Sequence, residues 1–372
     1  MKVFLTAFFV VAFIQIFSAQ SADAVKLLNQ GVEEFSKNNF LTATSLYSKA
    51  IQLQPDYVKA YYNRGNTNLK LNLFNDALAD FNMCVDLDPD FIKAYYSRAL
   101  VYGKLNEVHK AISDYQYLIK AEPGSPVYQS NLGILYMQIK DYTSAIHSFK
   151  NALILEPYQS TSLWNLAVCY EESQNFAQLV MVLNQLENYK PDEVRLFELR
   201  GRGYLQLKDY SKAVIDYSKA ISLNPGKFIN YYYRGYCKHM LDNYNGALSD
   251  YERALELNPK HEASIKNLAF VANEIGDNYA IIKAYSNLLR LEEKAEYYVV
   301  RSSAHLNIAE YDEALEDLNT AIALNPNLAE AYYNRASAYS RMDENKKACK
   351  DLYKAAKLGY VKAYEHIQSM CD

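Results

Sequence analysis

The sequence of 372 residues predicts an all-α fold: a solenoid of about ten helix pairs followed by a C-terminal capping helix. Three observations support this fold class. Prolines recur every 34 residues, small residues recur at two fixed positions between them, and aromatic residues recur at two others. A fixed period of roughly 20–50 residues indicates a repeat architecture in which each repeat packs only on its neighbours. The length therefore does not imply several separate cores.

Proline marks the end of each repeat. Proline lacks an N–H and restricts the residue before it, so it ends a helix. The prolines spaced by 34 residues are Pro55, Pro89, Pro123, Pro157, Pro191, Pro225 and Pro259. Pro326 follows after 67 residues, which is two periods with one residue lost. The predicted units are 24–57, 58–91, 92–125, 126–159, 160–193, 194–227, 228–261, 262–294, 295–328 and 329–362, and 361–371 is the predicted capping helix.

Small residues occupy the two positions where the helices of a unit are expected to cross. Only a small side chain lets two helix backbones come close. Position twenty is usually alanine, as in Ala43 and Ala77, and aromatic residues at positions eleven and twenty-four fill the wider spaces. Position eight is small in all ten units: Gly31, Gly65, Ala99, Gly133, Ala167, Gly201, Gly235, Ala269, Ser302 and Ala336.

Arginine at position seven and aspartate at position twenty-three occur together in six units and are both missing from the other four. The pairs are Arg64 and Asp80, Arg98 and Asp114, Arg200 and Asp216, Arg234 and Asp250, Arg301 and Asp317, and Arg335 and Asp351. Positions that vary together indicate contact. We expect a partly buried, hydrogen-bonded ion pair between the two helices of each such unit. The alternative is that the arginines form a row that binds a ligand.

Residues 1–22 have the pattern of a signal peptide. Lys2 precedes an apolar run from Val3 to Phe17, and small and polar residues follow. Such a segment directs export and is removed afterwards, although an uncleaved anchor is the alternative. No other segment is apolar enough to span a membrane. The expected location is the periplasm or the outside of the cell, with the lumen of the endoplasmic reticulum as the alternative. The absence of an N-x-S/T sequence favours a bacterial envelope.

Composition and motifs exclude several classes of function. The formal charge of −4, without a basic stripe, argues against binding of nucleic acid, whose phosphates select clustered cations. The six histidines show no spacing typical of metal ligands, and no nucleotide-binding or hydrolase motif occurs. We expect neither a cofactor nor a metal, and no enzymatic activity.

Two of the five cysteines lie where they could form a disulfide. Cys349 is in the second helix of the last unit and Cys371 is in the capping helix expected to pack on it. After export a bond between them would fasten the C-terminus. Two free thiols are the alternative. Cys84 is at a core position, and Cys169 and Cys237, two units apart, are too distant to bond along a solenoid.

The spacing and the residue types together resemble the tetratricopeptide repeat family over residues 24–362. The resemblance implies a right-handed α-α superhelical solenoid in which the first helix of each unit lines a groove. Unit five departs from the pattern with Leu179 at position twenty. Unit eight departs with Ile281 there and with the missing residue near Leu291, where we expect altered curvature.

The resemblance also assigns residues to the groove. In this family, asparagines at position six can hold the backbone of an extended peptide, and aromatic rings beside them supply apolar contact. Position six has Asn63, Asn131, Asn165, Asn267 and Asn334. Position five has Tyr62, Tyr96, Trp164, Tyr232 and Tyr333, and position nine adds Asn66, Arg202, Tyr236 and Phe270. The alternative is that these asparagines only solvate the surface. Some members of the family bind a C-terminal carboxylate through a clamp of five residues on three successive units. Units one to three of this sequence match only two of the five, so such a clamp is disfavoured.

The sequence therefore predicts a non-enzymatic scaffold that binds peptide or protein segments in the groove, in envelope assembly or export. A holdase-type co-chaperone of a secretory lumen is the first alternative, although no J domain or H-P-D motif follows the repeats. A structural spacer without a groove ligand is the second.

Overall fold

A computed structural model describes residues 22–371 and contains only helices and short connections in that range. The predicted signal peptide lies, up to residue 21, outside the described residues. The chain divides into two compact halves, an N-terminal half over Met1–Tyr189 and a C-terminal half over Lys190–Asp372. Each is described below by itself.

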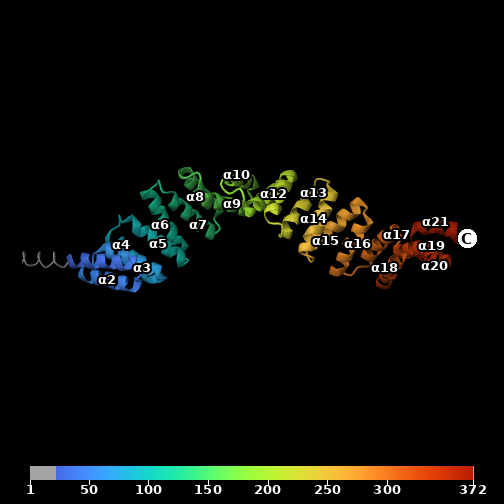
Figure 1. Cartoon of the computed structure of the whole chain (residues 1–372), viewed down its shortest axis with the longest axis horizontal. Coiled ribbons are helices and arrows are strands. Elements are labelled where there is room, and N and C mark those ends of the chain that lie inside the picture. The colour runs from blue at the N-terminus through green and yellow to red at the C-terminus, as the bar shows by residue number, and fades with distance from the viewer. Residues whose placement is uncertain (1–21, 372) are drawn as a thin grey trace, which may run out of the picture. The chain divides into compact units, whose positions relative to one another are not determined.

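The N-terminal half is a row of helix pairs (Figure 1). A helix over residues 22–36 precedes α2 (Phe40–Leu53). The pairs that follow are α3 (Val58–Lys70) with α4 (Phe74–Leu87), α5 (Ile92–Lys104) with α6 (Val108–Ala121), α7 (Pro126–Gln138) with α8 (Tyr142–Leu155), and α9 (Ser160–Glu172) with α10 (Phe176–Glu187). Here α2, α4, α6 and α8 also pack on the first helix of the pair that follows.

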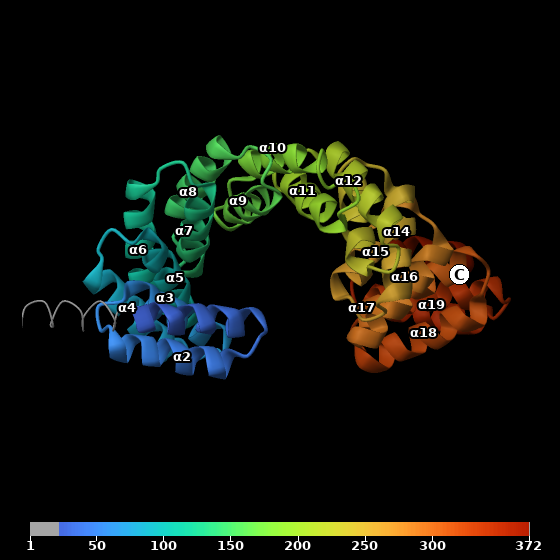
Figure 2. The same cartoon turned by 60° about the vertical axis from the view of Figure 1, so that its left-hand side comes forward.

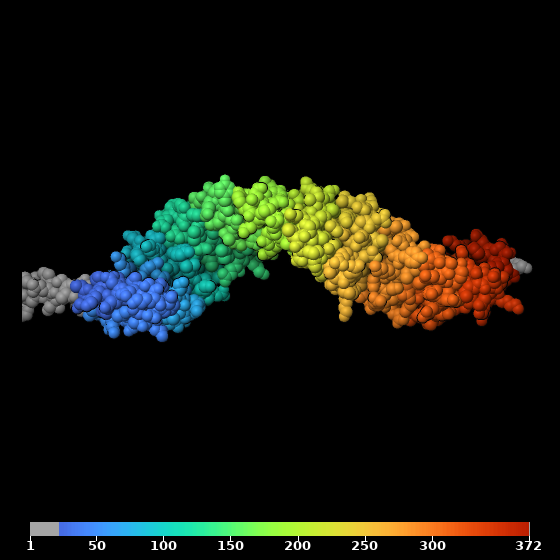
Figure 3. Space-filling model, in the orientation of Figure 1, coloured from blue at the N-terminus to red at the C-terminus, as the bar shows by residue number. Residues whose placement is uncertain are grey.

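The C-terminal half has the same kind of arrangement, seen from another side in Figure 2. Its elements are α11 (Val194–Gln206) and α12 (Tyr210–Leu223), α13 (Phe228–His239) and α14 (Tyr244–Leu257), α15 (Glu262–Ile275) and α16 (Asn278–Leu291), α17 (Ala295–Asn307) and α18 (Tyr311–Leu324), α19 (Ala329–Arg341) and α20 (Asn345–Lys357), and α21 (Val361–Met370). Within each half of the chain, the side chains of one helix pair lie against those of the adjacent pairs (Figure 3).

The described residues form ten helix pairs and one further helix, so the predicted all-α fold is confirmed; the first helix begins at residue 22, two residues before the first predicted unit. α21 is the helix expected as the cap, and it packs on α20. The residue missing from unit eight falls in the loop of Glu292, Glu293 and Lys294 between α16 and α17, so both helices keep the usual length. The prediction of one continuous solenoid and that of altered curvature stay predictions.

Every pair is joined by a turn in which the residue at position fifteen has a positive φ. The angle lies between 57° and 71° at all ten of these residues. They are Asn38, Asn72, Asn106, Lys140, Gln174, Lys208, Asp242, Gly276, Ala309 and Asp343. This left-handed conformation ends the first helix and reverses the chain. Glycine, which adopts it without strain, occurs only once among the ten.

Small residues at position eight make room for the aromatic ring at position twenty-four of the same unit. A Cβ added to Gly65 would come within 2.7 Å of the Phe81 ring, and one added to Gly133 within 2.8 Å of the Phe149 ring. Such rings are fully buried. The close approach expected between the two helices therefore also depends on the ring that fills the gap.

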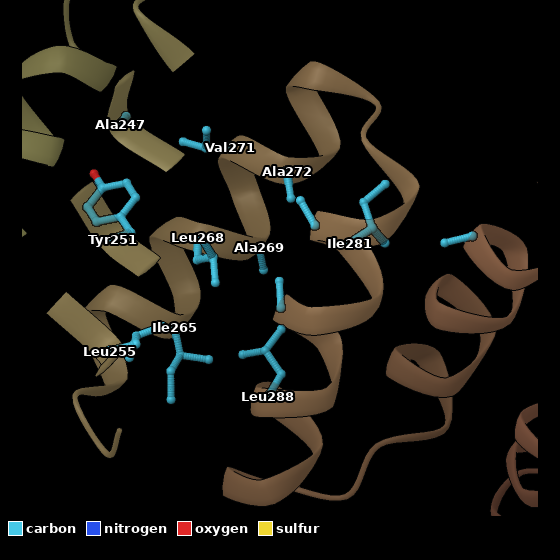
Figure 4. Packing of buried hydrophobic residues seen from close by; sticks show 13 residues of the cluster. Ala247, Tyr251, Leu255, Ile265, Leu268, Ala269, Val271, Ala272, Ile281 and Leu288 are labelled. Atoms are coloured by element: carbon cyan, nitrogen blue, oxygen red, sulfur yellow. The ribbon is translucent and has the colours of Figure 1, made fainter. Parts of the chain in front are cut away.

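Unit eight keeps a ring at position twenty-four, Tyr285, but this ring is only partly buried and packs against a cluster of mainly aliphatic residues. Leu268 and Ala269 of α15 lie between Tyr251 of α14 and Ile281 and Leu288 of α16 (Figure 4). These residues are buried in one cluster. Ile281, the larger residue at position twenty, is accommodated there beside small neighbours such as Ala272 and Ala284.

Candidate binding face

The predicted groove residues lie on the first helices of the pairs, and the rings at position five are half-buried. Tyr62 meets the Phe91 ring edge-on at 5.1 Å between centroids. Tyr96 lies 5.6 Å from the Tyr128 ring and 6.2 Å from the Tyr115 ring. These rings are therefore fixed by packing and present only part of their surface.

Asparagines at position six are partly used by the protein itself. Asn131 Nδ2 donates to Tyr115 Oη at 3.0 Å, and Asn334 Nδ2 donates to Ser303 Oγ at 3.0 Å. Asn267 lies beside the hydroxyls of Tyr232 and Tyr251 and lowers the pKa of both against the larger upward effect of burial. Asn63 and Asn165 are half-buried. Each engaged amide joins its unit to the preceding one.

In the C-terminal half, two of the predicted residues at position nine, Arg202 and Phe270, are exposed. Phe270 is 49% exposed and stacks on His239 with 4.9 Å between ring centroids. Tyr236 lies edge-on to the same His239 ring at 6.5 Å. Arg202 is exposed on α11. These side chains offer aromatic surface and a guanidinium on one set of first helices.

Two more of the predicted residues are held by their neighbours. Tyr333 on α19 lies 4.7 Å from the Tyr360 ring and 5.4 Å, edge-on, from the His366 ring of α21. Trp164 on α9 is half-buried. The capping helix therefore covers one side of Tyr333.

Two hollows open beside these first helices. In the N-terminal half, a hollow of about 230 Å³ between α5 and α7 has a mainly apolar lining that includes Leu100, Gly103 and Ile134. In the C-terminal half, a hollow of about 200 Å³ lies over α11 and α13. The residues that line it are Glu198, Arg202, Tyr217, Lys227, Ile229, Asn230 and Tyr233. The second hollow is the more polar of the two.

Each of the six arginines at position seven forms an ion pair with the aspartate of its own unit and donates two parallel hydrogen bonds to it. Nε and Nη2 donate to the two carboxylate oxygens at 2.6–3.1 Å in every pair. The aspartates are 2–5% exposed. Burial raises the pKa of Asp80, and the hydrogen bond from Arg64 opposes that rise. The arginines are thus engaged as structural partners.

A third interaction of these arginines was not expected from the sequence. In five of the pairs, arginine Nη1 donates at 2.7–3.2 Å to a serine or asparagine at position twenty-five of the preceding unit. The acceptors are Ser48, Asn82, Ser218, Ser286 and Asn319. The sequence contains the signal: Gln116, Lys150 and Glu252 occupy this position before the units that lack arginine.

An aromatic ring at position four completes the arrangement. Each of the six guanidinium carbons lies 5.1–5.7 Å from the centroid of the ring three residues earlier. The rings belong to Tyr61, Tyr95, Phe197, Tyr231, Tyr298 and Tyr332. Units without the arginine have Leu27, Gln129, Leu163 and Ile265 there. We call the aromatic residue, the arginine, the aspartate and the preceding serine or asparagine the arginine cluster.

Cys349 and Cys371 form a disulfide that joins α20 to the residue after α21, with 5.7 Å between the Cα atoms. Cys84, Cys169 and Cys237 are buried free thiols. Between residues 22 and 371, no three histidine, cysteine or acidic side chains gather as metal ligands. No helix in that range combines the length and the hydropathy that crossing a bilayer requires.

The helix pairs define a helical-repeat protein, and comparison with protein families identifies the repeat. A model described as "TPR repeat" matches residues 31–72 and 310–343. Models described as "Tetratricopeptide repeat" match 58–91, 96–158, 194–227, 229–261 and 329–358. Together they cover more than half of the sequence, and the chain belongs to the tetratricopeptide repeat family. The matched ranges leave out units five and eight, whose sequences depart from the pattern.

Solved structures of tetratricopeptide proteins are similar to the chain. One is a tetratricopeptide repeat protein from Parabacteroides merdae, 20% identical, covering 67% of this chain and 99% of that one with a TM-score of 0.46. MamA from Desulfovibrio magneticus is 19% identical and covers 46% and 97%, with a TM-score of 0.42. YrrB, described as a TPR protein with an unusual peptide-binding site, is 17% identical and covers 59% and 96%, with a TM-score of 0.33. No curated protein matches the chain.

Proposed function

We propose that the chain is a non-enzymatic scaffold that binds peptide or protein segments along the face formed by its first helices. Helical-repeat arrays present extended surfaces suited to such segments. The observation that carries the proposal is the row of rings, amides and a guanidinium at positions five, six and nine. Rigid rings provide contact area at low cost in conformational entropy, and amides pair with a peptide backbone whatever its sequence.

We further propose that the protein is exported and serves envelope assembly or export. Two features support this location. Residues 1–22 have the pattern of a signal peptide, and a disulfide joins Cys349 to Cys371. Disulfides persist in oxidising compartments and are rare in the cytosol. The periplasm or the extracellular space fits both features.

Affinity capture with exposed variants tests the scaffold. The exported chain is immobilised and incubated with an extract of the source cells, and native proteins bound in stoichiometric amounts are measured by mass spectrometry. Phe270→Ser and Arg202→Ser, which alter exposed first-helix residues, are expected to reduce capture of the partner about tenfold, because buried rings and arginines dominate binding. Ile215→Ser, on the 67% exposed Ile215 of α12, is the matched control and should retain the partner.

Other results would contradict the scaffold and select an alternative. Capture of unfolded proteins in preference to native ones would indicate a holdase. A native partner retained equally by all three variants would place binding elsewhere on the molecule. Complete absence of a stoichiometric partner would favour a structural spacer.

A further inference from the structure

A third hollow lies in the N-terminal half where residues of α2, α3 and α4 meet. Its volume is about 370 Å³. Its lining includes Thr44, Arg64, Asn68, Leu73, Asp76 and Asp80. None of the lining residues is at position five, six or nine of a first helix. The hollow is therefore separate from the proposed binding face.

In five other units a tyrosine at position eleven occupies the equivalent place. These tyrosines are Tyr102, Tyr136, Tyr170, Tyr204 and Tyr339. The ring centroid of Tyr102 is 5.8 Å from the guanidinium carbon of Arg98 in the same unit. Tyr136 Oη accepts a hydrogen bond at 3.2 Å from Gln116, at position twenty-five of the preceding unit. A ring at position eleven therefore reaches both position seven of its own unit and the second helix before it.

Unit two has no ring at position eleven. The residue there is Asn68, which is 4% exposed and donates to Asp80 at 3.1 Å, so its short side chain points to the ion pair and leaves the place of the ring open. The Arg64 side chain is 24% exposed, the highest value among the six arginines. The hollow is therefore the space of a missing ring, with a guanidinium in its wall.

An exposed leucine borders the hollow at a position that is polar in every other unit. Position sixteen, directly before the second helix, is asparagine, aspartate or glutamate in nine units and Leu73 in unit two. Leucine is among the least favourable residues at a helix N-cap, where polar and acidic side chains are stabilising. Leu73 is nevertheless 45% exposed. It offers apolar surface beside the hollow at the expense of the start of α4.

The charge at the hollow favours a cation. In unit three, Lys110 at position nineteen lies 5.4 Å from the Tyr102 ring centroid, and lysines of units six and ten lie over their tyrosines at 5.2–5.4 Å. Unit two has Asp76 at this position, exposed and without a side-chain hydrogen bond or ion pair among residues 22–371. Because Arg64 is already paired with Asp80, the Asp76 carboxylate is not balanced by a pair of its own.

We propose that this hollow binds an aromatic side chain of a partner protein, with a lysine or arginine of the same partner paired to Asp76. The ring takes the place that Tyr102 fills in unit three, beside the Arg64 guanidinium and against Leu73. Rings attract cations that lie over their faces, and an ion pair at the rim selects the sign of the partner's charge more than it adds affinity. The site goes beyond the proposed function, because it does not depend on the first-helix face.

Titration of the full chain with three short peptides tests the proposal. The probes are N-acetyl-Ala-Lys-Tyr-Lys-Ala-amide, the same peptide with glutamine for both lysines, and the same peptide with alanine for tyrosine. Binding is read from the methyl signals of Leu73 and Thr44, which line the hollow and are shifted by the ring current of a bound tyrosine. The first probe should bind about tenfold more tightly than the probe without the ring and about threefold more tightly than the probe without lysine.

Two variants and one control locate the effect. Asn68→Tyr places in the hollow the ring that five other units have at this position, and it should weaken binding of the first probe at least tenfold. Asp76→Asn removes only an exposed charge and should abolish the threefold gain from lysine while the ring still binds. Asp86→Asn removes another exposed charge of α4, outside the hollow, and should change neither preference. The Asp76→Asn result decides the case if Asn68→Tyr does not fold.

The proposal fails if the probe without the ring binds as tightly as the first probe, if folded Asn68→Tyr still binds it, or if no probe shifts the Leu73 and Thr44 methyl signals. Equal affinity for the lysine and glutamine probes, or a lysine preference that survives Asp76→Asn, would overturn the pairing with the carboxylate. These outcomes leave the first-helix face untouched, since the capture experiment with Phe270→Ser tests that face separately.

Discussion

At the scale of single residues, positions seven and twenty-three are packed in two different ways in this chain, and the arginine cluster is one of them. Six units place a guanidinium between an aromatic ring and a buried carboxylate, and in five of them it also donates to a side chain of the preceding unit, as Arg98 does. The other four have neither charge there: three place leucine at position seven, as in Leu166 with Val182, and unit one places Gln30 with Leu46. A buried ion pair often adds little net stability over apolar packing, but breaking it leaves a buried charge unpaired. We infer that the cluster fixes the register between units.

We predict that Arg98→Leu lowers the free energy of unfolding by about 3–5 kcal/mol, because it leaves Asp114 buried and unpaired. The double variant Arg98→Leu with Asp114→Val copies unit five and should cost roughly 1 kcal/mol or less. Urea denaturation followed by circular dichroism measures both. A double variant as unstable as the single one would refute the pairing energy.

Arg234→Leu provides an internal comparison. Lys238 Nζ lies 2.8 Å from Asp250 and would still neutralise the carboxylate after Arg234 is removed. The loss should therefore be smaller than that caused by Arg98→Leu, in the same denaturation measurement. Equal losses would show that Lys238 does not compensate.

At the scale of the helical elements, the turn inside each pair carries a small backbone strain. Nine of its ten left-handed residues have a side chain, and Ala309 has φ 64°. We predict that Ala309→Gly stabilises the chain by about 0.5–1 kcal/mol, since relief of the left-handed strain exceeds the added entropy of the unfolded chain. Gly276→Ala is the reverse control. An added Cβ there meets no atom within 4 Å, so its expected loss of similar size comes from φ 71° alone.

The last element depends on the disulfide. α21 packs on α20 through Ala363 and partly buried Ile367 and Met370, a small interface for a terminal helix. We predict that Cys349→Ser with Cys371→Ser weakens its docking by about 2–3 kcal/mol, because the bond closes a loop of 22 residues. Hydrogen exchange of the α21 amides should quicken at least tenfold. The amides of α3 and α4 in the same sample are the control, and unchanged exchange in α21 would contradict the prediction.

The sequence predicted the elements better than the contacts between side chains. The proline period predicted the all-helical fold, and the shared occurrence of Arg98 and Asp114 indicated their contact. The role of Asn82 was missed because its partner Arg98 lies in the next unit and no local pattern points to it. The hydrogen bond from Asn131 to Tyr115 was missed for the same reason, because Tyr115 belongs to the preceding unit.

At the scale of the whole molecule, the cysteines divide into two chemical classes. Cys84, Cys169 and Cys237 are 0% exposed in the packing of the helix pairs, and burial raises the pKa of each thiol to about 12. Cys349 and Cys371 are bonded at the last helix. The thiolate is the reactive form, so buried protonated thiols are inert. In the folded chain the three buried thiols are therefore not available to exchange with the disulfide of Cys349 and Cys371.

This distribution gives a prediction for thiol titration of the chain isolated from its own compartment. An aromatic disulfide reagent at pH 8 should find no fast-reacting thiol in the native protein, because the three free thiols are buried and protonated. Three thiols should react after denaturation without a reductant, and all five after reduction. The Cys349→Ser and Cys371→Ser double variant should give three in both denatured states. Five reactive thiols in the denatured, unreduced protein would refute both the disulfide and the oxidising compartment proposed for the chain.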